Sequence, residues 1–221
     1  MTDTLSRLAL LDTNTVSDSL DFLGLPGATY GLRPLWNCPK IVGRAATVQL
    51  GPKGDNLPSA HLITPVIDAI STDDRILVIA GGIDRVSCWG DILANAAKFK
   101  GLRGSIIDGN CRDIEGSEAI GYPVFGRQVT MISARNRIVQ IASGTPVEMD
   151  GVTVYEGDYV IADRCGTVFI PTRWIDEVLS LGEHVLRRQE AMVSAVRAGQ
   201  SVTEIMHDRQ FEAIRSTGPV Q

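Results

Sequence analysis

The segment from Arg75 to Phe125 decides the fold, and it begins with RILVIAGG at residues 75–82, a continuous apolar run closed by two glycines. Beyond it the pattern predicts a helix, a short buried strand, a second helix and another strand, at residues 91–100, 105–107, 114–120 and 123–125. Strands that alternate with helices in this way are typical of βαβ units and a parallel sheet. The sequence therefore predicts an α/β fold class.

The flanking segments add two groups of elements. On the N-terminal side we expect a helix over 5–24 with a second start at Asp12 and an end at Gly24, a loop over 25–40, a strand run over 41–50 and a helix over 59–70. After residue 128 we expect short β segments at 129–133, 138–141, 147, 152–154, 159–162 and 168–170, then a long amphipathic helix from Pro171-Thr172 to Gly199. No repeat or linker divides the sequence, so we expect one domain over 1–221 with a C-terminal helical arm over about 172–216.

Composition narrows the function classes. The 221 residues carry 21 basic and 26 acidic side chains, a net charge of −5, which argues against a nucleic-acid partner. Three histidines and four isolated cysteines argue against a structural zinc site or a disulfide framework, so any metal is expected to be a hard cation held by oxygen. No signal peptide and no membrane-length apolar run are evident, so we expect a cytoplasmic protein with no membrane partner.

Two segments place polar groups where a parallel sheet binds ligands, beyond the carboxyl ends of its strands. The first is WGDILA at 89–94, where Gly90 allows close backbone approach and the free N–H groups of Ile92 and Leu93 form an anion site at a helix start. The second is IDGNCRD at 107–113, in which Arg112 offers a planar fork for a carboxylate and Asp113 a hard oxygen ligand.

Each segment alone has a structural alternative. Asp91 is also explained as a helix N-cap, which is the commoner role of aspartate at a helix start, and Arg112-Asp113 as a loop salt bridge that leads into the next helix. Their combination favours a function, because a carboxylate-binding helix end, an arginine fork and two acidic residues together suit a 2-oxo acid bound with a metal. Neither segment contains lysine, which disfavours a Schiff-base aldolase.

The same segments carry a resemblance. GDILANAA at 90–97, GLRG at 101–104 and DGNCRD at 108–113 resemble the core pattern of the RraA-like family, including its spacing of an Asp, twenty intervening residues and Arg-Asp. Flanking stretches are similar too: VSDSLD at 16–21, GDN at 54–56, and the run from Gly157 to Pro171. That family includes class II 4-hydroxy-4-methyl-2-oxoglutarate/4-carboxy-4-hydroxy-2-oxoadipate aldolases and regulators of ribonuclease E activity.

The resemblance implies a layered α/β/β/α sandwich of the swivelling β/β/α type, assembled as a homotrimer or a dimer of trimers. It implies that Gly90 to Leu93 and Arg112 bind a small 2-oxo acid, and that Asp113 ligates Mg²⁺ or Mn²⁺, with Asp91 acting through water. Glu190 is the nearest positional match to a glutamate that a neighbouring subunit contributes in some members, although Glu183 lies close by on the same helix.

The implied chemistry is retro-aldol cleavage of a 4-hydroxy-2-oxo dicarboxylic acid to release pyruvate, with oxaloacetate decarboxylation through the same enolate. The alternatives are a protein-binding regulator of an RNA-degrading endonuclease, and a lyase or decarboxylase for another 2-oxo acid. Three other positions carry reactive or polar groups, but a structural role explains each of them better. Cys111 has no visible partner base, His61 fits the apolar face of a helix, and Lys53 to Asn56 fits a turn.

Overall fold

The computed structural model describes residues 4–54 and 62–206. Among these residues one sheet has the strand order β1-β6-β5-β3-β2-β10-β11, with β4 paired to β5 and β7 to β2. The strands are β1 (Arg33–Pro34), β2 (Ile41–Pro52), β3 (Arg75–Ala80), β4 (Ser87–Trp89), β5 (Gly104–Cys111), β6 (Val124–Val129), β7 (Ile138–Ser143), β10 (Tyr159–Asp163) and β11 (Gly166–Ile170). The helices are α1 (Thr4–Leu10), α2 (Thr13–Leu23), α3 (Thr64–Ala69), α4 (Asp91–Phe99), α5 (Ile114–Ala119), the short 3₁₀ helix Thr172–Trp174, α6 (Ile175–Arg197) and α7 (Val202–Ile205).

The centre of the sheet is parallel, as the alternation of strands and helices predicts. Strands β2, β3, β5 and β6 pair in parallel, whereas β10 and β7 pair with β2 in antiparallel register. The α/β fold class is confirmed.

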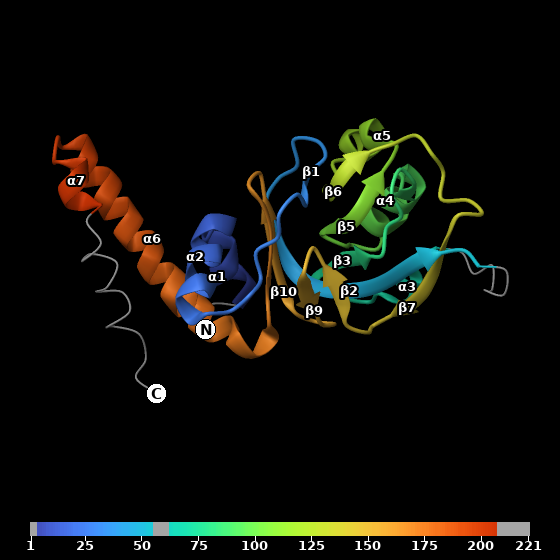
Figure 1. Ribbon diagram of the computed structural model, residues 1–221, viewed down its shortest axis with the longest axis horizontal. Helices are drawn as coiled ribbons and strands as arrows, with labels where there is room; N and C mark the ends of the chain where they lie inside the picture. The colour runs from blue at the N-terminus through green and yellow to red at the C-terminus, as the bar shows by residue number, and fades with distance from the viewer. Residues whose placement is uncertain (1–3, 55–61, 207–221) are drawn as a thin grey trace.

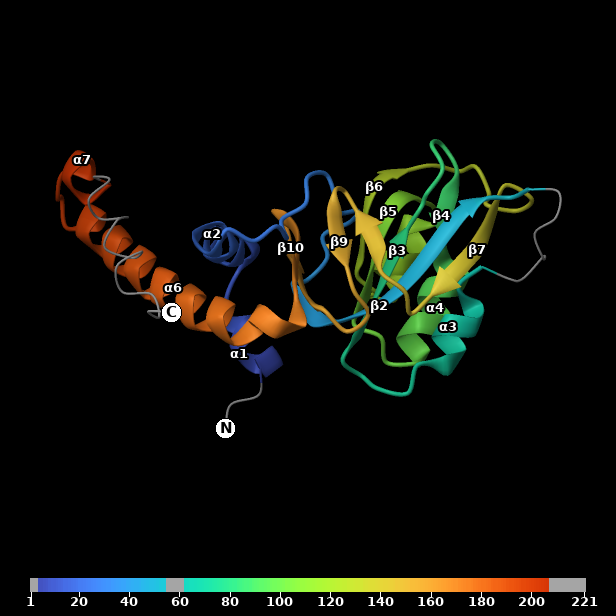
Figure 2. The same ribbon diagram turned by 60° about the horizontal axis from the view of Figure 1, so that its bottom comes forward.

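Strand β3 is buried on both faces, which explains its uninterrupted apolar sequence. Its side chains alternate between two cores: Leu77 and Ile79 contribute to one, and Ile76, Val78 and Ala80 to the other. Helices α3 and α4 cover the first core, and Figure 2 shows them side by side against the sheet. The hairpin of β8 (Val147–Met149) and β9 (Val152–Val154) covers the second core with four buried apolar side chains. The sheet therefore lies between a helical layer and a second β layer.

A third apolar core joins the two ends of the chain. Helices α1, α2 and α6 pack against β10 and β11, and beyond this contact α6 projects away from the sheet as an arm (Figure 1). The division of the first helical segment occurs where the sequence predicts it, because the Asp12 carboxylate accepts a 2.7 Å hydrogen bond from the Thr15 N–H. Gly24, at φ 66°, ends α2 in the left-handed conformation that glycine adopts without strain. The long helix expected from Pro171-Thr172 to Gly199 is confirmed, because the 3₁₀ turn Thr172–Trp174 leads into α6, which ends at Arg197 just before Gly199.

The expected β segment at 129–133 is wrong. Strand β6 ends at Val129, and residues 130–137 form a loop that pairs as a strand with no segment of residues 4–54 or 62–206. Val129 and Ile132 have strong β propensity, but these two side chains and that of Met131 remain exposed, so no packing surface supports an extended strand there. Two short strands, β1 and β4, were not expected, because two or three residues carry no readable period.

The helix expected over 59–70 is shorter in the structure, where α3 begins at Thr64 and has Pro65 in its first turn. His61, together with Asp55 and Asn56 of the GDN motif, lies outside the described residues, as does the end of the helical arm after residue 206. Within the described part of the chain, no helix combines the length and the hydropathy that crossing a membrane requires.

An ion pair links the helical arm to the N-terminal helix α1, and its contribution to stability is expected to depend on pH. The Arg7 Nε and Glu183 Oε1 atoms are 2.7 Å apart, and the hydrogen bond from Arg7 lowers the pKa of Glu183. Because both side chains are about one-third exposed, we expect Glu183→Gln to lower the free energy of unfolding at pH 7 by about 1 kcal/mol or less.

The pair stabilises the fold fully above the unfolded-state pKa of about 4.3 and less as the pH falls through the lower folded-state value. Thermal unfolding at pH 7 and pH 3 would therefore show a difference between the two proteins that shrinks with acidity. The exposed Glu204→Gln on α7 serves as the control. A deficit that stayed constant between the two pH values would contradict this account.

Candidate active site

The pairing of β4 with β5 brings the two predicted segments together. The two strands run parallel, with Trp89 opposite Cys111, so the segments that follow them leave the sheet at the same level. Gly90 and Asp91 follow the first strand, and Arg112 and Asp113 follow the second. A backbone hydrogen bond from the Arg112 N–H to the Trp89 carbonyl, 2.9 Å long, fixes this register one residue further.

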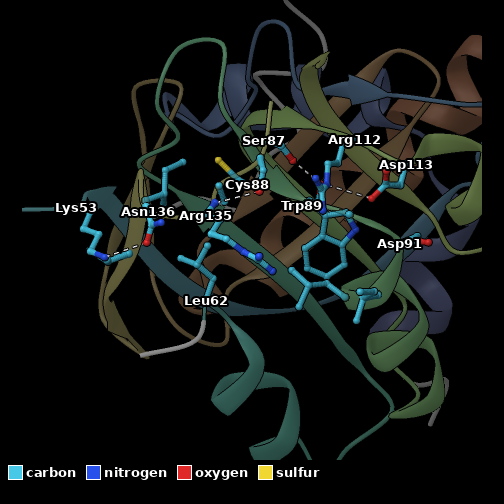
Figure 3. Close-up of a pocket in the computed structure, with 17 residues that line it drawn as sticks. Lys53, Leu62, Ser87, Cys88, Trp89, Asp91, Arg112, Asp113, Arg135 and Asn136 are labelled. Atoms are coloured by element: carbon cyan, nitrogen blue, oxygen red, sulfur yellow. Dashed lines mark hydrogen bonds and ion pairs between the residues drawn. The ribbon is translucent and has the colours of Figure 1, made fainter. Parts of the chain in front are cut away.

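A cavity of about 370 Å³ opens beside these strand ends. Its wall includes the predicted residues Gly90, Asp91, Ile92, Leu93, Arg112 and Asp113. In Figure 3 the labelled Asp91, Arg112 and Asp113 lie together at one end of the cavity. The structure thus assembles the predicted residues of one chain on a single surface, with the exception of Glu190.

The start of α4 is open to an anion. Gly90 is the N-cap, and no side chain caps the helix. The first intrahelical bond runs from the Ala94 N–H to the Gly90 carbonyl, at 3.1 Å, so the N–H groups of Ile92 and Leu93 precede the helical ladder. These donors and the helix dipole favour a negative group at this position. The alternative of Asp91 as N-cap is wrong, because Asp91 is already the first helical residue.

Arg112 and Asp113 form the salt bridge that the sequence gives as an alternative to a binding role. This ion pair lies on the wall of the cavity. Arg112 Nε and Asp113 Oδ2 are 3.2 Å apart, and the two side chains are 40% and 38% exposed. The backbone of Asp113 is left-handed, at φ 57° and ψ 41°, and its side chain does not cap α5. Such a conformation costs about 1–3 kcal/mol in a non-glycine residue and is concentrated at functional sites.

Two glycines set how closely the carboxylates approach the backbone. A Cβ atom at Gly90 would lie 2.8 Å from Asp113 Oδ2 and 3.4 Å from Arg112 Nε. A Cβ atom at Gly116 on α5 would lie 2.9 Å from the Cβ of Asp91. Both glycines are therefore needed for the present positions of the two acidic side chains.

The cavity also contains two basic residues outside the predicted site: Arg135, which the sequence does not single out, and Lys53, which the sequence assigns to a turn. Lys53, at the end of β2, and Arg135, in the loop between β6 and β7, both line it. Lys53 Nζ donates a 3.2 Å hydrogen bond to Asn136 Oδ1, which positions its ammonium group on this loop. The sequence predicts a strand for the first part of this loop, and nothing in the local sequence indicates that the loop reaches the cavity.

The cysteine thiols near the cavity are not poised for nucleophilic attack. Cys111 is fully buried, and burial raises its pKa well above the usual value. Burial also raises the pKa of Cys88 to about 11. Both thiols are protonated at neutral pH, so a structural role for Cys111 agrees with its environment.

The acidic residues of the cavity suit a hard divalent cation. Asp91 and Asp113 are its two carboxylates, and the space that a Cβ atom at Gly90 would fill lies against Asp113. In the described residues no three His, Cys, Asp or Glu side chains cluster as a metal site. Mg²⁺ nevertheless fits this donor set, because it is usually held by one or two carboxylates together with waters and substrate oxygens.

Glu190 lies apart from this set. It is exposed on α6 and does not line the cavity of its own chain. Glu183, on the same helix, accepts a 2.7 Å hydrogen bond from Arg7 Nε.

Known proteins are similar to this chain in sequence and in fold. The Legionella pneumophila protein DlpA is 28% identical over 212 residues, which are 96% of this chain but 34% of DlpA, so the chain spans about a third of that relative. A Halalkalibacterium halodurans protein named "Putative 4-hydroxy-4-methyl-2-oxoglutarate aldolase" is 29% identical over 194 residues, 88% of this chain and 89% of that protein. The crystal structure of an uncharacterized protein from Pseudomonas syringae pv. tomato superimposes with a TM-score of 0.81 at 30% identity, covering 91% of this chain and 96% of that one.

A family model described as RraA-like, Aldolase/RraA, matches residues 13–169. This range contains both strand ends that form the cavity wall, together with the sheet that positions them. The chain therefore belongs to the RraA-like family.

Proposed function

We propose that this protein is a divalent-metal-dependent lyase that cleaves a 4-hydroxy-2-oxo dicarboxylic acid and releases pyruvate. The observation that carries the proposal is a single cavity lined by an uncapped helix start, Arg112 and the carboxylates of Asp91 and Asp113. Membership of a family that includes aldolases supports it, as does the name of the Halalkalibacterium halodurans relative.

The 2-oxo acid end of the substrate has two complementary groups in the cavity. The N–H groups of Ile92 and Leu93 bind its carboxylate at the positive end of α4. Arg112 places a guanidinium beside the 2-oxo oxygen, where negative charge develops as the bond between C3 and C4 breaks. The ion pair with Asp113 orients this guanidinium before the substrate arrives.

The metal site in this proposal uses Asp113 as a direct ligand and Asp91 through water, with Mg²⁺ or Mn²⁺ as the cation. When bound, the cation supplies Lewis-acid stabilisation of the charge that develops on the pyruvate fragment. We further propose that the protein acts as a homotrimer or a dimer of trimers, in which Glu190 approaches the cavity of a neighbouring subunit.

Cleavage requires loss of the proton from the 4-hydroxyl group. Of the titratable side chains on the cavity wall, Asp91 and Asp113 are the acidic ones, and Cys88 is protonated. In the proposal a water molecule held by Asp91 accepts the hydroxyl proton while C4 becomes a carbonyl and the electron pair of the broken bond passes to C3. Oxaloacetate places a carboxylate at the equivalent bond, so loss of CO₂ delivers electrons to the same carbon and is expected as a second activity.

The metal requirement is directly testable. We expect Asp113→Asn to lower the kcat/KM for pyruvate release from 4-hydroxy-4-methyl-2-oxoglutarate by about 100-fold or more, since Lewis-acid stabilisation is worth several kcal/mol. EDTA should abolish the activity of the wild-type protein, and added Mg²⁺ should restore it. The exposed Lys100→Gln provides a control.

Activity that is indifferent to both EDTA and Asp113→Asn would refute a metal-dependent lyase. If no 2-oxo acid were turned over and the protein instead bound an RNA-degrading endonuclease, the regulator alternative within the family would be favoured.

A second prediction follows from the contact between Gly90 and the ion pair. Gly90 is extended, at φ −158° and ψ −179°, so alanine fits the backbone there. Its methyl group would displace Asp113, because the Cβ position lies 2.8 Å from Asp113 Oδ2. We expect Gly90→Ala to weaken Mg²⁺ binding by about tenfold or more, with little change in thermal stability.

Titration of Mg²⁺ by isothermal calorimetry, alongside thermal unfolding, measures both effects. Unchanged Mg²⁺ affinity in a well-folded variant would show that Asp113 does not hold the cation in this geometry.

A further inference from the structure

Trp89 carries a buried hydrogen-bond donor that finds no acceptor in the described part of the chain. Its side chain is 1% exposed, and the indole Nε1 atom is closed to solvent and unpartnered. An indole nitrogen can only donate, so it cannot be satisfied by exchanging roles with a neighbour. Because most buried polar groups in native proteins are hydrogen-bonded, an orphaned donor at a candidate active site points to a partner that joins it there.

This donor lies beside the acidic end of the cavity. Trp89 lines the cavity as the last residue of β4, and its carbonyl accepts the 2.9 Å hydrogen bond from the Arg112 N–H. The Cβ position of the next residue, Gly90, is 2.8 Å from Asp113 Oδ2. In Figure 3 the nitrogen lies on the side of the indole ring that faces Asp91 and Asp113. The unused donor is therefore close to both carboxylates of the site.

Asp113 has acceptor capacity to spare. Among the residues that the structure describes, its carboxylate forms one polar interaction, in which Oδ2 lies 3.2 Å from Arg112 Nε, and it does not cap α5. A carboxylate can accept about four hydrogen bonds or metal bonds in all. Carboxylates that ligate metals are usually hydrogen-bonded as well, and this second contact orients them. An unsatisfied donor and an underused acceptor thus occur at the same end of one cavity.

We propose that Trp89 is a positioning residue for Asp113, whose carboxylate accepts the indole N–H when it holds a divalent cation. This inference rests on the proposed function for the role of Asp113 as a metal ligand. It assigns a role in cation binding to a side chain outside the pattern of Asp91 and Arg112-Asp113. It also explains why an unsatisfied donor is kept at this position of the cavity wall.

The packing of the indole holds the donor in place. The rings of Trp89 and Tyr122 are stacked, with centroids 6.1 Å apart and planes at 16°. Tyr122 is itself fixed, because its hydroxyl shares a 2.9 Å hydrogen bond with Ser105 Oγ and its N–H donates to the Ser117 carbonyl. The indole cannot turn its nitrogen elsewhere without breaking this stack. The donor is therefore preorganised, and its partner has to come to it.

Other tryptophans of the chain provide matched references. Trp174 Nε1 is also buried and unpartnered within residues 4–54 and 62–206, but Trp174 precedes α6 and does not line the cavity. Trp36 Nε1 donates a 3.1 Å hydrogen bond to the Tyr122 carbonyl. The three indole groups thus comprise an orphaned donor at the site, an orphaned donor away from it and a satisfied donor.

Proton–nitrogen NMR of the indole groups tests the bond directly. The three signals are assigned with the variants Trp36→Phe, Trp89→Phe and Trp174→Phe. On titration with Mg²⁺ we expect the Trp89 signal to move downfield, because its proton gains a charged acceptor, while the other two stay in place. An unmoved Trp89 signal in a protein that binds Mg²⁺ would overturn the proposal.

Cation affinity tests whether the bond matters for binding. We expect Trp89→Phe, which keeps an aromatic ring against Tyr122, to weaken Mg²⁺ binding about tenfold in calorimetric titrations. Trp174→Phe makes the same chemical change away from the cavity and should leave the affinity unchanged. Thermal unfolding establishes that both variants are folded. Unchanged Mg²⁺ affinity in a folded Trp89→Phe protein would contradict a positioning role.

Asp91→Asn identifies the acceptor. If Asp113 accepts the indole N–H, the downfield movement of the Trp89 signal should persist in the Asp91→Asn protein at saturating Mg²⁺. Loss of the movement in an Asp91→Asn protein that still binds Mg²⁺ would assign the bond to Asp91 and overturn the proposal.

These measurements also separate the inference from the lyase function. A Mg²⁺-dependent movement of the Trp89 signal without turnover of any 2-oxo acid would refute the lyase and leave the role of Trp89 standing. Turnover that EDTA abolishes, together with an unmoved Trp89 signal, would support the lyase and refute the role of Trp89. Absence of Mg²⁺ binding would overturn both proposals.

Discussion

The parallel pairing of β4 with β5 is the constraint on which the candidate site depends. Its register, with Trp89 opposite Cys111, ends both strands at one level and leaves the next two residues of each chain side by side. Gly90 and Asp91 thereby meet Arg112 and Asp113, although twenty residues and helix α4 separate them in the chain. A shift of one residue in this register would turn the side chains of the shifted strand to the opposite face, because the side-chain period of a strand is two.

The electrostatics of the cavity differ from those of the molecule. An acidic protein presents a wall with three basic side chains, two carboxylates and an uncapped helix start. A small dianion bound with a divalent cation suits this arrangement, since each negative group has a separate positive partner. The positive groups of the cavity wall are therefore a local feature, and the net charge of the chain gives no indication of them.

Two glycines determine where the acidic side chains of the site can lie. At Gly90 and Gly116 the missing side chains make room for the carboxylates of Asp113 and Asp91. Asp113 itself adopts a left-handed backbone conformation, which is uncommon in residues other than glycine. The surrounding strands and helices hold it there, which is the usual condition for strain at a functional position.

The sequence by itself determined the α/β class, the parallel core around RILVIA at 75–80, the start and end of α2 and the resemblance that carries the family. These features depend on periodicity, capping residues and spacing, all of which are local. It also singled out six of the residues that line the cavity, because four of them begin a predicted helix and two of them leave a predicted strand.

Only the tertiary structure decided that the loop after β6 returns to the cavity and adds Arg135 and Asn136, and that the end of β2 adds Lys53. The apolar residues of that loop resemble a strand in sequence, but within the described part of the chain they pair with no other strand, and their side chains are exposed. Which loop reaches which strand end depends on packing between distant segments, and no local pattern encodes it.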